Sequence, residues 1–242
     1  MNKLKSVIQY ECMTSFKYIW LFYGIQYAVV ALITLTIGIS TGTFENIGTD
    51  SLEINSLIYV GVLGVLGFKQ DFKMLLQNGF TRKMIFNATL FMFCFISGTM
   101  AVIDTIVGNL IHHFNIDYSS LYSGIYGYGN IFMNWLCLFL LYVSICCLLY
   151  LAVLVINKVG KMISIYLGIG LGSCILFVIA LFRYVLSANV VKNIVDFFVK
   201  VLGFMADGTI NYFFPTLTLL LIISILAVGA YTVIRHTELN SL

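Results

Sequence analysis

An acidic residue inside an apolar run is the residue of this sequence most able to do chemistry. Asp104 lies within a long apolar stretch, and Asn109 follows it a little over one helical turn later. An ionisable side chain at membrane depth is costly, and it marks a functional-site hypothesis. We therefore expect Asp104 and Asn109 to contribute to an outer gate or a substrate path. A structural hydrogen bond or an interfacial position is the alternative for Asp104.

Motifs for catalysis and for metal binding are missing from the sequence. It contains neither a G-x-x-x-x-G-K-[ST] phosphate loop nor an H-E-x-x-H metalloprotease motif. His112 and His113 are adjacent, and neighbouring side chains on a helix point in different directions, so we expect no metal site there. The adjacent Cys146 and Cys147 fit neither redox nor zinc-ligand spacing. We expect no catalytic residue, no metal and no cofactor bound by this chain.

A second distinctive stretch, residues 69–83, joins two apolar runs. Phe72, Leu75 and Leu76 fall at i, i+3 and i+4, which predicts one apolar face of a short helix over 70–79. Asp71 and Lys73 mark its polar side. A connection between two spans needs only a few residues, so this helix suits contact with a partner. A linker that lies on the membrane surface is the alternative.

The end of the same stretch carries helix stop and start signals. Asn78 and Gly79 are typical of a helix C-terminus, where glycine accepts a positive φ. Thr81, Arg82 and Lys83 are suited to cap and anchor the helix that follows.

Two further amphipathic segments flank the apolar runs. Residues 3–18 place apolar side chains on one helix face and polar or basic side chains on the other, which predicts a helix in the membrane surface. It either steers the chain into the first span or contacts a cytoplasmic partner. Near the other end, Lys192, Asp196 and Lys200 fall at i, i+4 and i+8 on one helix face. That pattern predicts an amphipathic helix over 189–202 at the outer interface.

The elements that must position these residues are apolar helices. Hydrophobic residues make up 61% of the 242 residues, charged residues only 10%, and the mean hydropathy is +1.01. A globular domain carries roughly 25% charged residues, so this composition predicts an all-α integral membrane protein with a single transmembrane domain over 1–242. The second run is short and rich in glycine. Six spans are expected, at about 19–39, 52–68, 85–109, 131–156, 162–182 and 210–234.

The Lys and Arg residues predict the orientation of these spans. With six spans, ten cations fall on one side, which the positive-inside rule assigns to the cytoplasm together with both termini. They are Lys3, Lys5, Lys17, Lys69, Lys73, Arg82, Lys83, Lys158, Lys161 and Arg235. Arg183 and the two lysines of the 189–202 segment are the exceptions. The net charge of +3 reflects this bias and does not indicate nucleic-acid binding.

The sequence LLQNGFTRK at 75–83 resembles the L-x-N-G-[aliphatic or aromatic]-[ST]-R-K segment of bacterial type-2 ABC exporter permeases. Small Gram-positive members of that family have six spans, about this length, and both termini inside. In the family, the loop between spans two and three is a coupling helix seated in a cleft of the ATPase subunit. The resemblance implies that residues 71–83 face an ATPase, and that 3–18 is a connecting helix. Short helices also precede the last span in the family, as 189–202 does here.

The expected function is therefore that of a permease subunit of an ATP-driven exporter in the cell membrane. Its partners would be a cytoplasmic ATPase, which holds ATP and Mg, a second copy or a related permease, and membrane lipids. The substrate would be hydrophobic or amphipathic: a peptide, a lipid or a drug. A substrate-binding importer subunit of the vitamin-uptake type, or an immunity or sensor protein without transport, is the alternative.

Overall fold

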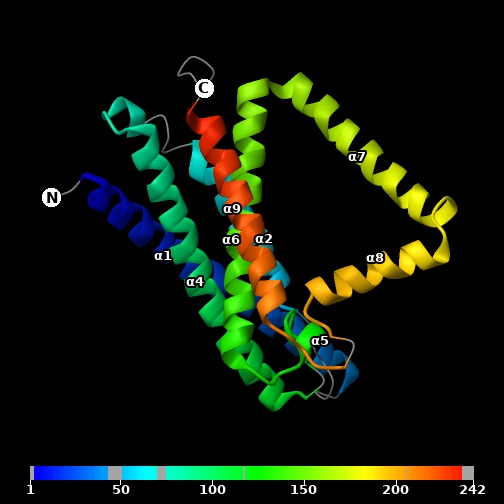
Figure 1. Cartoon of the computed structure of the whole chain (residues 1–242). Coiled ribbons are helices and arrows are strands. Elements are labelled where there is room, and N and C mark those ends of the chain that lie inside the picture. The colour runs from blue at the N-terminus through cyan, green and yellow to red at the C-terminus, as the bar shows by residue number, and fades with distance from the viewer. Residues whose placement is uncertain (1–2, 43–50, 70–74, 117, 206, 236–242) are drawn as a thin grey trace.

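The computed structural model describes residues 3–42, 51–69, 75–116, 118–205 and 207–235. In these ranges the regular elements are helices, and one isolated antiparallel bridge joins Phe204 to Ile210. The expected all-α class is confirmed. The helices are α1 (Lys3–Thr41), α2 (Glu53–Lys69), α4 (Arg82–Phe114), α5 (Ser123–Tyr126), α6 (Ile131–Val159), α7 (Lys161–Tyr184), α8 (Ala188–Val201) and α9 (Phe213–Arg235) (Figure 1).

Five of these helices have the length and composition to cross a membrane. They are α1 from Cys12 onward, α4, α6, α7 and α9, and their apolar stretches run from 23 to 33 residues. The remaining apolar helix, α2, has 17 residues and so is about 25 Å long, shorter than the roughly 30 Å hydrocarbon core. The architecture is that of a helical membrane protein with several spans.

The N-terminal part differs from the prediction. A separate surface helix was expected over 3–18, but α1 is one continuous helix of 39 residues. Residues 3–23 contain neither glycine nor proline, the residues that end or kink helices, so nothing in the sequence separates the two segments.

The last long helix begins three residues later than expected. Ile210 is held in the bridge to Phe204, and the side-chain oxygen of Asn211 accepts a hydrogen bond from the Phe213 N–H at 3.0 Å. These contacts keep residues 210–212 out of α9. The predicted helix over 189–202 is present as α8, one residue displaced.

The core is built around α6, which packs against α2, α4 and α9, while α1 packs on α4 (Figure 1). Glycines bring α2 close to α6. A Cβ added at Gly64 would lie 2.7 Å from the backbone oxygen of Cys146, and one at Gly61 would lie 2.8 Å from the Leu149 side chain. Small residues allow helices to approach closely in a membrane, and here they fix the short α2 against the centre of the bundle.

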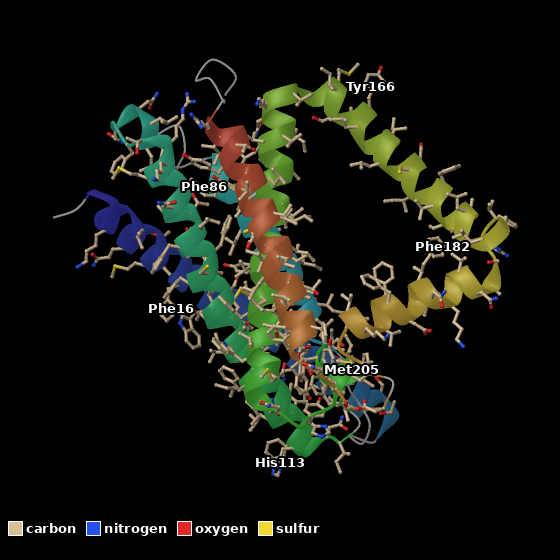
Figure 2. The ribbon with its side chains drawn as sticks, viewed as in Figure 1. Phe16, Phe86, His113, Tyr166, Phe182 and Met205 are labelled. Carbon is tan, nitrogen blue, oxygen red and sulfur yellow. The ribbon has the colours of Figure 1, made fainter. Side chains whose placement is uncertain are left out.

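The helices α7 and α8 stand apart from this core. Within its apolar stretch, α7 has no buried residue, and it leads away from the end of α6 before α8 turns back toward the start of α9 (Figure 1). Tyr166 lies near the start of α7, and Phe182 lies in the angle between the end of α7 and α8 (Figure 2). A Cβ added at Gly168, Gly170 or Gly172 of α7 would meet no atom of the described residues within 4 Å, so these glycines do not mediate helix packing within this chain as described.

Candidate functional site

Four helices meet at the carboxylate of Asp104. This residue of α4 is 4% exposed, and its Oδ1 accepts a hydrogen bond from the Tyr23 hydroxyl of α1 at 2.8 Å. Its Oδ2 accepts one from the Tyr142 hydroxyl of α6 at 2.6 Å. The Tyr23 oxygen also lies 3.4 Å from Ser56 Oγ of α2, and its hydroxyl is 3.2 Å from the Met100 carbonyl. We call Tyr23, Ser56, Asp104 and Tyr142 the Asp104 cluster.

The helical repeat explains how one hydroxyl reaches two groups of α4. Met100 and Asp104 are four residues apart, so they share a face of the helix. Hydrogen bonds to an ionised acceptor are roughly twice as strong as neutral ones, and buried acids require such partners. The cluster therefore supplies hydrogen-bond partners to a buried acid, and it links α1, α2, α4 and α6 at one place.

Asp104 was expected either near an outer gate or in a structural hydrogen bond. The structure places it in hydrogen bonds and away from solvent. Asn109 does not join the cluster: its side-chain amide donates to the Thr105 carbonyl of its own helix at 2.7 Å. The two residues are thus on one helix but have separate partners.

A second buried acid begins α2. Glu53 is 2% exposed, and its Oε2 accepts a hydrogen bond from the Leu121 N–H at 3.4 Å. Its Oε1 lies 3.2 Å from the position that a Cβ would take at Gly108 of α4. Glycine at this position therefore leaves room for the glutamate between the two helices.

Sequence reasoning missed most members of this region. Glu53 stands at the end of an apolar run, where an acid reads as an interfacial residue. Tyr23 and Tyr142 lie inside apolar runs, and the signal that identifies them is their hydroxyl, which needs a partner when it is buried.

Aromatic side chains connect the loop around α5 to the segment before α9. The Tyr126 hydroxyl donates to the Leu202 carbonyl at 2.8 Å, and the Tyr126 ring stacks with Phe204 at 5.7 Å between centroids. Burial, together with neighbouring groups that include Tyr212, raises the pKa of Tyr126 to about 12. The hydroxyl therefore stays protonated, and remains a donor, at neutral pH.

The connection between α2 and α4 contains a short helical turn, and this turn ends in a defined motif. Residues 75–77 are helical, and Gly79 has a φ of 77°. The Gly79 N–H donates to the Leu76 carbonyl at 3.0 Å, and the Phe80 N–H donates to the Leu75 carbonyl at 3.1 Å. This pair of bonds is a Schellman motif, so the predicted helix stop at Gly79 is confirmed.

The side chains of this connection divide into anchored and exposed groups. Leu75 is 5% exposed within the core, and Leu76 and Phe80 pack against the core from partly buried positions. Asn78 and Lys83 are exposed. The apolar face of the predicted helix therefore points into the bundle as far as it is described. Asp71, Phe72 and Lys73 lie outside the described residues.

The start of α4 is fixed at two points. Thr81 caps the helix, because its hydroxyl oxygen accepts a hydrogen bond from the Met84 N–H at 3.3 Å. Arg82 donates from Nη1 to the Arg235 carbonyl at the end of α9, at 2.6 Å. The predicted cap and anchor are thus found at Thr81 and Arg82.

The charged side chains of α8 are exposed, and so is much of its apolar surface. Lys192, Asp196 and Lys200 are exposed, and Phe197 and Phe198 are 61% and 58% exposed. An amphipathic helix that buries neither face in its own protein suits a membrane–water boundary.

No metal site is found within the described ranges, where no group of three or more His, Cys, Asp or Glu side chains is placed to hold an ion. Comparison of the chain with protein-family models, with curated proteins and with solved structures finds no match. The class that the fold defines is an all-helical membrane protein with several long apolar helices, four of its helices joined at one buried carboxylate.

Proposed function

We propose that the chain is the membrane-spanning permease subunit of an ATP-driven exporter. Counting α2, it would cross a bacterial cell membrane six times with both termini in the cytoplasm. The sequence lacks a phosphate loop, so ATP and Mg would bind to a separate ATPase subunit. The exported molecule would be hydrophobic or amphipathic, and a second permease would complete the transporter.

The observation that carries this proposal is the anchored connection between α2 and α4. Its resemblance to the type-2 exporter segment concerns residues 75–83, and those residues form a capped turn whose two ends are held by the bundle. Leu75 is buried before the turn, and Arg82 bonds to the end of α9 after it. A displacement of the exposed turn at Asn78 would therefore be transmitted to α4, because the turn is anchored on both sides.

The Asp104 cluster supplies a route for that force. Asp104 lies 22 residues after Arg82, which corresponds to about 33 Å along α4. Because its carboxylate bonds to α1 and α6, a shift of α4 would displace both helices. Small helix shifts of this kind underlie many switching transitions. In the proposed mechanism, ATP-driven closure of the ATPases moves α4 and switches the pathway between inward and outward states.

The distribution of cations supports the proposed sidedness. The start of α4, the end of α6 and the end of α9 lie at the same end of the bundle (Figure 1). These ends carry Arg82, Lys158 and Arg235. Positive residues remain on the cytoplasmic side of membrane proteins, so this end would face the ATPase.

The importer alternative requires accessible polar groups near the outer side. Asp104 is 4% exposed, and both of its oxygens are bonded within the protein, so it does not offer such a group. A sensor or immunity protein would need no ATPase, and the experiment below distinguishes it.

The test is isolation of the chain from its native membrane, followed by measurement of a co-purifying ATPase subunit and of ATP hydrolysis. Leu75 is a poor site for substitution because Leu75→Asp would place a charge in the core. The exposed pair Gln77→Asp and Lys83→Glu is suited instead, since both side chains lie at the surface. The control is Lys200→Glu, which reverses an exposed charge on α8.

The proposal predicts that the Gln77 and Lys83 changes remove the ATPase and its activity while the chain stays folded. Lys200→Glu should leave both unchanged. A complex that keeps its ATPase after the double change would contradict the coupling role, and a chain that isolates without any ATPase would favour the sensor alternative.

A further inference from the structure

A groove of about 660 Å³ runs between α1 and the first part of α2. Each wall carries a row of branched aliphatic side chains at i, i+4 and i+8, and these side chains are 45% to 63% exposed. The volume lies in the range of about 300–1,000 Å³ that small-molecule sites occupy. The two rows are Ile25, Val29 and Ile33 on α1 and Ile54, Ile58 and Val62 on α2.

Two buried polar atoms of residues that line this groove have no hydrogen-bond partner among the described residues: Gln26 Oε1 and the Tyr59 hydroxyl. Gln26 is 7% exposed; its Nε2 donates to the Leu52 carbonyl at 3.3 Å, while no described residue donates to its Oε1. Buried acceptors are rarely left unsatisfied, because the lost hydration is not replaced. The bond to Leu52 is long, so the amide can turn its oxygen toward a donor in the groove. Asn55 adds an exposed amide to the same lining.

The lining restricts the charge of any occupant. Among the described residues that line the groove, none is acidic, basic or histidine. Glu53 follows Leu52 in the sequence, but it points away, toward Gly108 of α4 and the Leu121 N–H. A charged head group would therefore lose its hydration without gaining a counter-charge.

We propose that this groove binds a single-chain amphiphile with an uncharged head that carries a hydroxyl or an amide. The aliphatic tail lies between the two rows of Ile and Val side chains, and the head donates to Gln26 Oε1 and meets the Asn55 amide. As the substrate class of the exporter, this amphiphile rests on the proposed function. Its binding to the groove does not require the ATPase.

The experiment uses the purified chain in detergent and a monoacylglycerol with a photoreactive diazirine in its acyl chain. After illumination, the labelled peptides are identified by mass spectrometry. We expect label on 25–33 and 54–62, and about fivefold less label from the methyl ester of the same acyl chain, the factor that one neutral hydrogen bond supplies. Asn55→Ala and Gln26→Leu should reduce this preference for the hydroxylated probe.

A matched pair of substitutions tests the location. Val29→Trp fills the groove and should abolish the label there, whereas Val178→Trp changes an equally apolar exposed position on α7 and should not. Label spread equally over α7 would show ordinary lipid contact and overturn the proposal, as would unchanged label in Val29→Trp. If the groove is labelled but no ATPase co-purifies with the chain, the proposed exporter function is contradicted and the proposed binding site still stands.

Discussion

Replacing Asp104 with alanine tests whether the Asp104 cluster holds the bundle together. The substitution removes both acceptors: the buried Tyr142 hydroxyl loses its bond to Asp104, and Tyr23 keeps only its longer contacts to the Met100 carbonyl and Ser56 Oγ. Each abandoned donor costs about 1–3 kcal/mol, and breaking a buried charged contact typically costs about 3–5 kcal/mol. We therefore expect Asp104→Ala to lower the free energy of unfolding by about 4 kcal/mol. For a chain of this size, each kcal/mol shifts Tm by about 2–4 °C, so the expected drop is about 8–16 °C.

The asparagine variant separates charge from shape. Asp104→Asn keeps one oxygen that accepts from one tyrosine, but its amide nitrogen cannot accept from the other. We expect a loss of about 1–2 kcal/mol, between the wild type and Asp104→Ala. The matched control is Asp196→Ala on α8, which removes an exposed acid and should change stability by no more than about 0.5 kcal/mol.

The assay is unfolding in mixed detergent micelles, followed by the fluorescence of Trp20 and Trp135. Tyr23→Phe, Tyr142→Phe and the double variant complete a cycle that measures how far the two bonds depend on each other. If Asp104→Ala unfolds at the temperature of the Asp196→Ala control, the cluster does not join the helices. The route from the α2–α4 connection to α1 and α6 then fails as well.

Four further substitutions, of which Gly168→Ala is a control, test the packing described above by the same unfolding assay. Gly64→Ala should destabilise the protein by about 1–3 kcal/mol, because the new Cβ would lie 2.7 Å from a carbonyl oxygen of α6, whereas Gly168→Ala meets open space and should be neutral or stabilising. Gly79→Ala should cost about 1–2 kcal/mol, since φ is 77° there, and an unchanged Tm would show that the turn adopts another conformation. Tyr126→Phe removes the bond to the Leu202 carbonyl and should cost about 1 kcal/mol, with faster hydrogen exchange after α8; unchanged exchange would contradict that role.

The local features of the fold could be predicted because they depend on nearby residues. The stop at Gly79, the cap at Thr81 and the helix over 189–202 each follow from side chains within a few positions. The predicted boundary at residue 18, between a surface helix and the first span, was wrong. A change from an amphipathic to an apolar pattern does not end a helix when no glycine or proline interrupts it.

The members of the Asp104 cluster could not be predicted, because they depend on the register between helices. Tyr23 and Asp104 are 81 positions apart, and no periodicity within either helix shows that they meet. Burial of Glu53 has the same origin, since it requires the space left at Gly108. The exposure of α7 is also beyond the sequence, because an apolar helix has the same composition whether it packs against protein or lipid.

The close seat of α2 on α6 has a consequence for biosynthesis. Helices enter the membrane in the order in which they are synthesised. The Cys146 thiol donates to the Val60 carbonyl, but it is synthesised 86 positions after it. With 17 residues, α2 is too short to span the hydrocarbon core comfortably by itself, and it also carries Glu53. We therefore expect α2 to reach its final depth only after α6 has emerged. The orientation of the α2–α4 connection would then be settled late, by a helix from the middle of the chain.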